Sequence, residues 1–139
     1  MQVFLARNAG PCILNENEQK EVTMQFILLI YNAENNGPQP GAEEFGPYMQ
    51  AYMDFTEEVK TAGKMLAGEA LQPVSTATTV SVREGKIELM DGPFAETKEQ
   101  LGGFYILDCT DLDEALAYAA KIPDAALGRV EVRPIMMFD

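Results

Sequence analysis

The chain of 139 residues contains no histidine and no tryptophan. Without an imidazole it can form no Ser-His-Asp or Cys-His nucleophile, no histidine-ligated zinc site and no histidine general base. Cysteine is scarce as well, because Cys12 and Cys109 are too few for a disulfide framework. Cys109 ends an apolar run, which predicts a small buried side chain and not a nucleophile.

Cations are few: ten lysines and arginines stand against 22 acidic residues, for a formal net charge of −12. A protein that binds nucleic acid directly needs a basic face, so the charge argues against that class. No segment approaches the roughly 18 apolar residues of a membrane span. The first 23 residues also lack the apolar core of a signal peptide. We therefore expect a cytoplasmic protein with reduced thiols and no membrane partner.

Hydrophobic residues make up 47% of the chain, which is typical of a folded domain. Residues 1–23 are mixed in character, whereas a strong apolar strand pattern begins at Met24. We expect residues 1–23 to be an N-terminal extension peripheral to the core. Residues 24–139 are then expected to form one domain.

The first half of that domain predicts a strand, a helix and a second strand. Residues 25–31 are apolar on both faces, as in a strand that is covered on both sides. A helix is predicted to begin at Pro47, since proline is favoured in the first helical turn, and to end at Gly63, since glycine is favoured just after a helix. Its stripe at helical spacing comprises Tyr48, Tyr52, Phe55, Val59 and Ala62. Residues 64–72 predict the second strand.

The second half predicts a hairpin and then another strand, helix and strand. Alternating runs at 76–83 and 86–90 flank Glu84-Gly85, the pattern of a β-hairpin. A polar loop at 91–100 precedes a strand at 101–109 that is apolar on both faces.

Asp111 and Glu114 have the spacing of a capping box and open the second predicted helix. The side chains predicted to face inward from it are Leu112, Ala115, Leu116 and Ala119. A last strand at 128–135 carries two valines on one face and charges on the other. The charged face holds Arg129, Glu131 and Arg133.

This order predicts an α+β fold, a ferredoxin-like βαβ-βαβ sandwich with an inserted hairpin. Two helices can cover only one face of such a sheet. The strands at 25–31 and 101–109 are nevertheless apolar on the other face too. Because a large bare apolar patch is rare on a monomer, we predict a homodimer in which two sheets close into a barrel-like core.

The loop that follows the hairpin carries the most distinctive run of residues. Gly92 before Pro93 forces a turn or an extended conformation. Asp91 can cap backbone N–H groups or face a cavity, and Phe94 can anchor the loop. By spacing alone this segment is a turn with a hydrophobic plug, in which Glu96, Thr97 and Lys98 add polar groups.

Asp91-Gly92-Pro93-Phe94 followed by Ala-Glu-Thr-Lys-Glu-Gln-Leu-Gly-Gly-Phe-Tyr resembles the DGPF-type branch of the YCII-related family. The resemblance covers essentially residues 24–135. It continues in Gly-Glu-Ala-Leu-Gln-Pro at 68–73, Ala-Thr-Thr-Val at 77–80, Asp-Leu-Asp-Glu-Ala at 111–115 and Val-Glu-Val-Arg-Pro at 130–134. The resemblance implies a dimeric α+β barrel, in agreement with the two-sided strands.

The wider family includes a lyase that removes chloride from a chlorinated muconate-type acid. Better-known members are thought to use a histidine with an aspartate in a cleft. Asp91 is the match to that aspartate, but this sequence has no histidine to pair with it. The resemblance therefore implies a site around Asp91 and leaves a His-Asp mechanism unavailable.

Without histidine, a general base needs a carboxylate whose pKa is raised by burial. Asp91, close to Phe94 and Tyr105, is one candidate and Glu69 is another. Glu131 is a further acidic candidate, and Arg133 or Arg129 can bind a substrate carboxylate. The alternative is that Arg133 and Glu131 form a structural ion pair. The predicted substrate-binding residues are Arg133, Glu131, Phe94, Thr97, Lys98 and Tyr105.

Two function classes remain open. The chain is either a cofactor-independent enzyme, with lyase- or isomerase-type proton transfer on a small acidic metabolite, or a non-catalytic ligand-binding or regulatory module. For the second class, the resemblance implies a link to sigma-factor signalling.

The acidic cluster at 108–114 has oxygen ligands suited to Ca²⁺ or Mg²⁺. Its use as a helix cap is favoured, so we predict neither a metal nor a cofactor.

Overall fold

The computed structural model describes residues 22–138. The predicted extension therefore lies, apart from its last two residues, outside the described part of the chain, and Cys12 lies outside it too. The elements are β1 (Met24–Asn32), α1 (Phe45–Thr61), β2 (Met65–Ala70), η1 (Val74–Thr76), β3 (Thr78–Arg83), β4 (Lys86–Asp91), β5 (Gln100–Cys109), α2 (Leu112–Ala119), η2 (Pro123–Ala125) and β6 (Arg129–Pro134).

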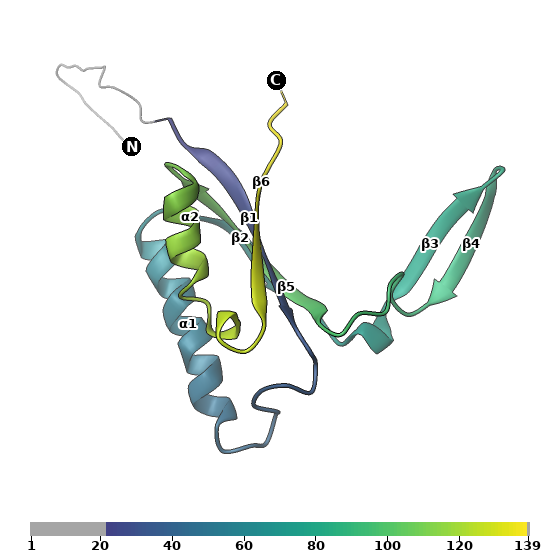
Figure 1. Cartoon of the computed structure of the whole chain (residues 1–139), viewed down its shortest axis with the longest axis horizontal. Helices are drawn as coiled ribbons and strands as arrows, with labels where there is room; N and C mark the ends of the chain where they lie inside the picture. The colour runs from purple at the N-terminus through teal and green to yellow at the C-terminus, as the bar shows by residue number, and fades with distance from the viewer. Residues whose placement is uncertain (1–21, 139) are drawn as a thin grey trace.

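Four strands form one antiparallel sheet in the order β2-β5-β1-β6, and both helices lie on the same side of it (Figure 1). This arrangement confirms the predicted ferredoxin-like α+β fold. None of the helices in the described residues is long and apolar enough to cross a membrane.

The core lies between the sheet and the two helices. Strand alternation turns Phe26, Leu28 and Ile30 of β1 toward the helices, and all three are buried. The helices contribute Phe55 and Val59 from α1 and the small residues Ala115 and Ala119 from α2. Cys109 is fully buried in this core, as predicted.

The other face of the sheet carries a second apolar cluster, which we call the open face. The strand register pairs Ile27 with Ile106 and Leu29 with Phe104, all on this face and all partly exposed. The predicted two-sided character of β1 and β5 is therefore correct. Among the described residues no helix packs on this side.

Two details of the helices differ from the prediction. Leu112 and Leu116 of α2 are 47% and 46% exposed, so the expectation that they face inward is wrong. Ala115 and Ala119 form the narrow contact strip of this eight-residue helix, which leaves the leucines on its flanks. Helix α1 begins at Phe45, ahead of Pro47. Of its predicted stripe only Phe55 and Val59 are buried, and Ala62 follows the helix and is exposed.

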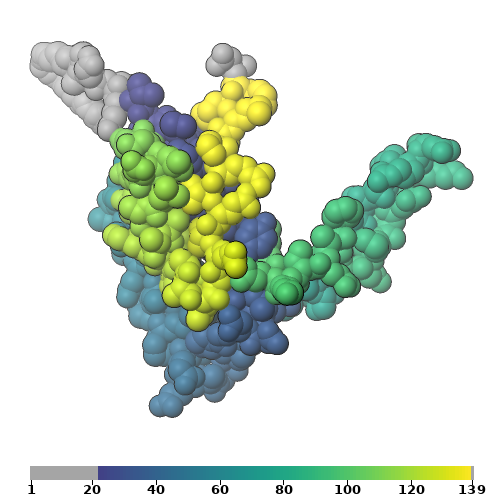
Figure 2. Space-filling view, in the orientation of Figure 1, coloured from purple at the N-terminus to yellow at the C-terminus, as the bar shows by residue number. Residues whose placement is uncertain are grey.

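Strands β3 and β4 form a separate two-stranded sheet that projects from the body of the molecule (Figures 1 and 2). The predicted turn is present: Glu84 and Gly85 have φ of 51° and 78°, the left-handed values of a two-residue hairpin turn. The apolar side chains of one hairpin face are all exposed. They are Val80, Val82, Ile87 and Leu89.

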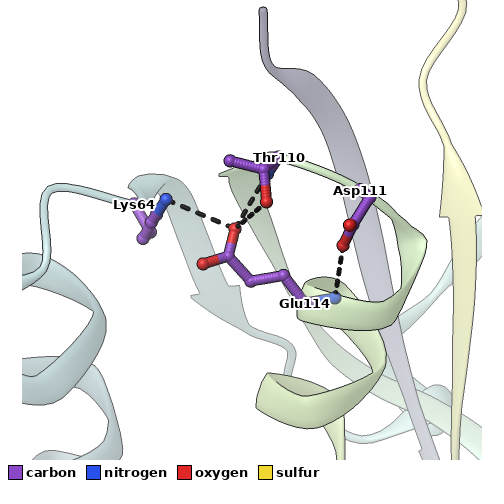
Figure 3. A network of polar contacts seen from close by, with 4 residues as sticks. All are labelled: Lys64, Thr110, Asp111 and Glu114. Atoms are coloured by element: carbon purple, nitrogen blue, oxygen red, sulfur yellow. Dashed lines mark hydrogen bonds and ion pairs between the residues drawn. The ribbon is translucent and has the colours of Figure 1, made fainter. Parts of the chain in front are cut away.

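The start of α2 is held by the network shown in Figure 3. The Glu114 N–H donates to Asp111 Oδ1 at 2.9 Å, which confirms Asp111 as the helix cap. The Glu114 carboxylate accepts from the Thr110 N–H at 2.8 Å and from Lys64 Nζ at 3.3 Å. The Thr110 N–H bond and then the Lys64 contact hold the pKa of Glu114 below its ordinary value. The acidic pair thus serves the helix end.

Candidate functional site

The residues predicted to form the site lie in three separate places. Asp91 is exposed at the end of β4, on the projecting hairpin. Glu69 is exposed on β2 and Arg133 on β6, the two edge strands of the sheet. With neighbouring strands about 4.8 Å apart, the two edges are separated by about 14 Å. Within one chain these three residues do not meet, and their catalytic and binding roles stay predictions.

Arg133 already has a partner. Its Nε donates to Glu131 Oε2 at 2.8 Å, and its Nη2 donates to the same oxygen. The structural ion pair considered as the alternative is therefore present. Both side chains lie on the open face, opposite Ile27 and Leu29 of β1.

The distinctive loop after β4 is held by polar contacts with the start of β3 and by contacts within the loop. Gly92, at φ 94°, donates its N–H to the Ala77 carbonyl at 2.7 Å and accepts from Thr79 Oγ1 at 2.8 Å. Thr97 Oγ1 donates to the Glu99 carbonyl, and Lys98 is exposed. Phe94 is 83% exposed, so in this chain it does not plug the loop.

A pocket of about 630 Å³ lies between α1, the β2–β5 side of the sheet and η2. Small residues of the strands form part of its lining: Gly68, Ala70, Gly102 and Gly103. At Gly68 this smallness is required, because a Cβ atom would lie 2.9 Å from the Tyr105 ring. Of the predicted site residues, Tyr105 and Glu69 border the pocket.

The polar end of the pocket is built by α1 and η2. The Tyr48 hydroxyl donates to Asp124 Oδ1 at 2.8 Å, and Asp124 is only 9% exposed. The N–H of Gly128 donates to the Asp124 carbonyl at 2.7 Å and fixes the backbone there. The ring of Tyr52 meets that of Tyr48 edge to face, with centroids 5.5 Å apart.

Both tyrosines at this end of the pocket have raised pKa values. Burial, with the hydrogen bond to Asp124 and its negative charge, raises the pKa of Tyr48 to about 12. Burial and then the charge of Asp124 raise the pKa of Tyr52 as well. At neutral pH the two phenols are therefore uncharged hydrogen-bond donors.

A second polar pair lies on the pocket wall. Thr56 Oγ1 and the Tyr105 hydroxyl are 2.7 Å apart, and the Tyr105 ring packs against Phe55 at 5.0 Å between centroids. Tyr105 was predicted from the sequence as a binding residue, and its side chain borders the pocket.

Comparison with known proteins places this chain in a family. The profile of the YCII-related domain matches residues 24–139. The chain belongs to the YCII-related family. A similar relative is an uncharacterised protein of Rhizobium meliloti (strain 1021), 38% identical over 117 residues, which cover 83% of this chain and 94% of the relative. Assignment to the DGPF-type branch stays a prediction.

Sequence reasoning missed the polar end of the pocket in this YCII-related chain. Tyr48 and Tyr52 were assigned to the apolar stripe of α1, although Thr56 continues the same face with another hydroxyl. A helix face of three hydroxyl groups was the available signal. Asp124 gave a weaker one, an acidic residue between Pro123 and a run of apolar residues.

Proposed function

We propose that this YCII-related chain binds a small molecule in the pocket beside α1, with Asp124 and Tyr48 as its main polar contacts. The observation that carries the proposal is the buried Asp124 carboxylate, hydrogen-bonded to a phenol at the wall of a 630 Å³ pocket. A buried carboxylate is costly, and groups with perturbed pKa values, such as Tyr48 and Tyr52 here, cluster at functional sites. A largely apolar lining with a few convergent polar groups is typical of ligand sites.

Proton transfer is the finer proposal for the same pocket. Asp124 offers a carboxylate as general base, and Tyr48 offers a hydroxyl in contact with it. A lyase- or isomerase-type reaction without a cofactor would need such a pair. The acidic metabolite expected from the sequence is tied to Arg133, which lies on the open face and outside this pocket.

The regulatory alternative uses the same pocket without turnover. A module linked to sigma-factor signalling would bind its ligand and release it unchanged.

The open face supports a further part of the proposal, a homodimer formed sheet to sheet, because its apolar cluster is uncovered in one chain. We also propose that the protein is cytoplasmic, and that residues 1–23 are an extension peripheral to a domain of residues 24–139.

A thermal-shift screen of small metabolites tests the pocket. We expect at least one compound to raise the Tm, and Asp124→Asn and Tyr48→Phe to weaken its binding about tenfold or more, since a hydrogen bond to a charged group contributes about 1.5–3 kcal/mol. Tyr118→Phe removes a phenol from α2, outside the pocket, and serves as the matched control. Equal losses in all three variants would reject the site.

Product analysis of each bound compound separates the two function classes. Conversion of the compound, lost in Asp124→Asn, supports the enzyme. Binding without conversion supports the regulatory module. An Asp91→Asn variant with unchanged turnover would remove Asp91 from the mechanism.

A further inference from the structure

The charges around the pocket are unevenly placed. Its acidic lining residues are Glu57, Glu69 and Asp124, whereas Lys60 is its cation. Lys60 is exposed near the end of α1. At about 1.5 Å per helical residue it lies about 18 Å along the axis from Tyr48. The end of the pocket at Asp124 therefore has a carboxylate and no basic side chain in its lining.

The groups around Asp124 suit a cation. Tyr48, which donates a hydrogen bond to Asp124, is uncharged and does not neutralise the carboxylate. Tyr48 meets the carboxylate through its hydroxyl, and the ring of Tyr52 lies edge to face with that of Tyr48, 5.5 Å apart between centroids. Aromatic faces attract ammonium groups, most strongly where water is displaced. A carboxylate ligand would instead be repelled by the charge of Asp124.

The rest of the pocket lining is largely apolar. Ile30, Met49 and Met53 line it, and the side chains of both methionines can adapt to a ligand of irregular shape. The volume of about 630 Å³ lies within the range of small-molecule sites, roughly 300–1,000 Å³. A ligand that fits this lining has an apolar body attached to its polar end.

We infer that the pocket takes an amine: a ligand whose protonated nitrogen lies against Asp124 and the rings of Tyr48 and Tyr52, with an apolar body along α1. This inference rests on the proposed function and names the ligand class for the same pocket. It departs from the acidic metabolite expected from the sequence. The net charge of −12 also favours the approach of cations over anions.

Three probes with the same aromatic body and different charge test the inference on the full chain. They are 2-phenylethylamine, 2-phenylethanol and 3-phenylpropionate, and their dissociation constants are measured by NMR titration. We expect the amine to bind at least tenfold more tightly than the alcohol and the acid. Asp124→Asn should remove this preference. Asp113→Asn, an equal change of charge on the exposed side of α2, should keep it.

The salt dependence of probe binding to the wild-type protein is a second measurement, which does not depend on whether a variant folds. Raising the salt concentration should weaken binding of the amine and leave binding of the alcohol nearly unchanged. The inference is overturned if the acid or the alcohol binds as tightly as the amine, and the pocket itself then still stands as a ligand site. If none of the three probes binds, the inference also fails, whereas the proposed function is decided separately by the metabolite screen.

Discussion

At the scale of single residues, Glu114 joins the start of α2 to two other segments. Its carboxylate accepts from the Thr110 N–H and from Lys64, and these contacts lower its pKa below the ordinary 4.5. A lowered pKa means that the folded state favours the ionised form. The resulting stabilisation is therefore present above about pH 4.5 and is lost as the pH falls through the lower folded-state value.

We expect Glu114→Gln to lower the free energy of unfolding by about 1 kcal/mol at pH 7, the typical contribution of a hydrogen bond. The difference from wild type should shrink as the pH falls below 4.5 and through the lower folded-state pKa of Glu114. Urea unfolding at pH 7 and at a series of lower pH values measures both effects. Asp113→Asn, its exposed neighbour, is the control, and an equal loss in the two variants at pH 7 would contradict the prediction.

Residue-level predictions were reliable where the contact is local in sequence. The Asp111 cap spans three residues and the Glu131–Arg133 pair spans two, so both could be inferred from spacing. The contact of Tyr48 with Asp124 joins positions 76 residues apart, and no local pattern contains it. The family resemblance directed attention to Asp91, whose surroundings within one chain are solvent-exposed.

At the scale of elements, β2 and β5 pack closely beneath α1 at the pocket, and Gly68 leaves no space there for a larger side chain. Gly68 lies opposite Tyr105 in the register, and an added Cβ would be 2.9 Å from its ring and 2.8 Å from Met65 Cε. Met65 can move, because its methyl group ends a flexible chain. Tyr105 cannot move freely, because Thr56 and Phe55 hold it.

Gly68→Ala is therefore expected to lower the free energy of unfolding by about 1–3 kcal/mol, the usual cost of overpacking. It should also weaken binding of any pocket ligand by displacing Tyr105. Gly102→Ala is the matched control in the same pocket lining, since its Cβ would find no heavy atom closer than 4.0 Å. Chemical denaturation of both variants gives the comparison, and two equal changes would argue against a close-packed strand pair.

Element positions followed from hydrophobic period and turn residues, including the hairpin around Glu84-Gly85. The direction in which the hairpin projects could not be predicted from the sequence, because nothing in its apolar face indicates which surface it contacts. A lone two-stranded hairpin is at best marginally stable in water. Its exposed apolar face, like the open face of the sheet, is therefore a feature whose meaning depends on the assembled molecule.

At the scale of the whole molecule, the ferredoxin-like fold leaves one face of the sheet without helices. Both helices cover one side of the sheet, and the open face presents Ile27, Leu29, Phe104 and Ile106. One charged pair, Glu131 and Arg133, borders this cluster at the β6 edge. An apolar centre with a polar rim is the usual anatomy of a protein interface.

We expect light scattering at micromolar concentration to give twice the mass of one chain. Ile27→Asp places a charge at the centre of the open face and should convert the dimer to a folded monomer, because the substituted side chain does not belong to the core beneath the helices. Ala117→Asp adds the same charge to the exposed surface of α2, on the opposite side of the sheet, and should leave the dimer intact. A wild-type monomer, or a dimer that persists in Ile27→Asp, would show that the open face is not the contact between chains.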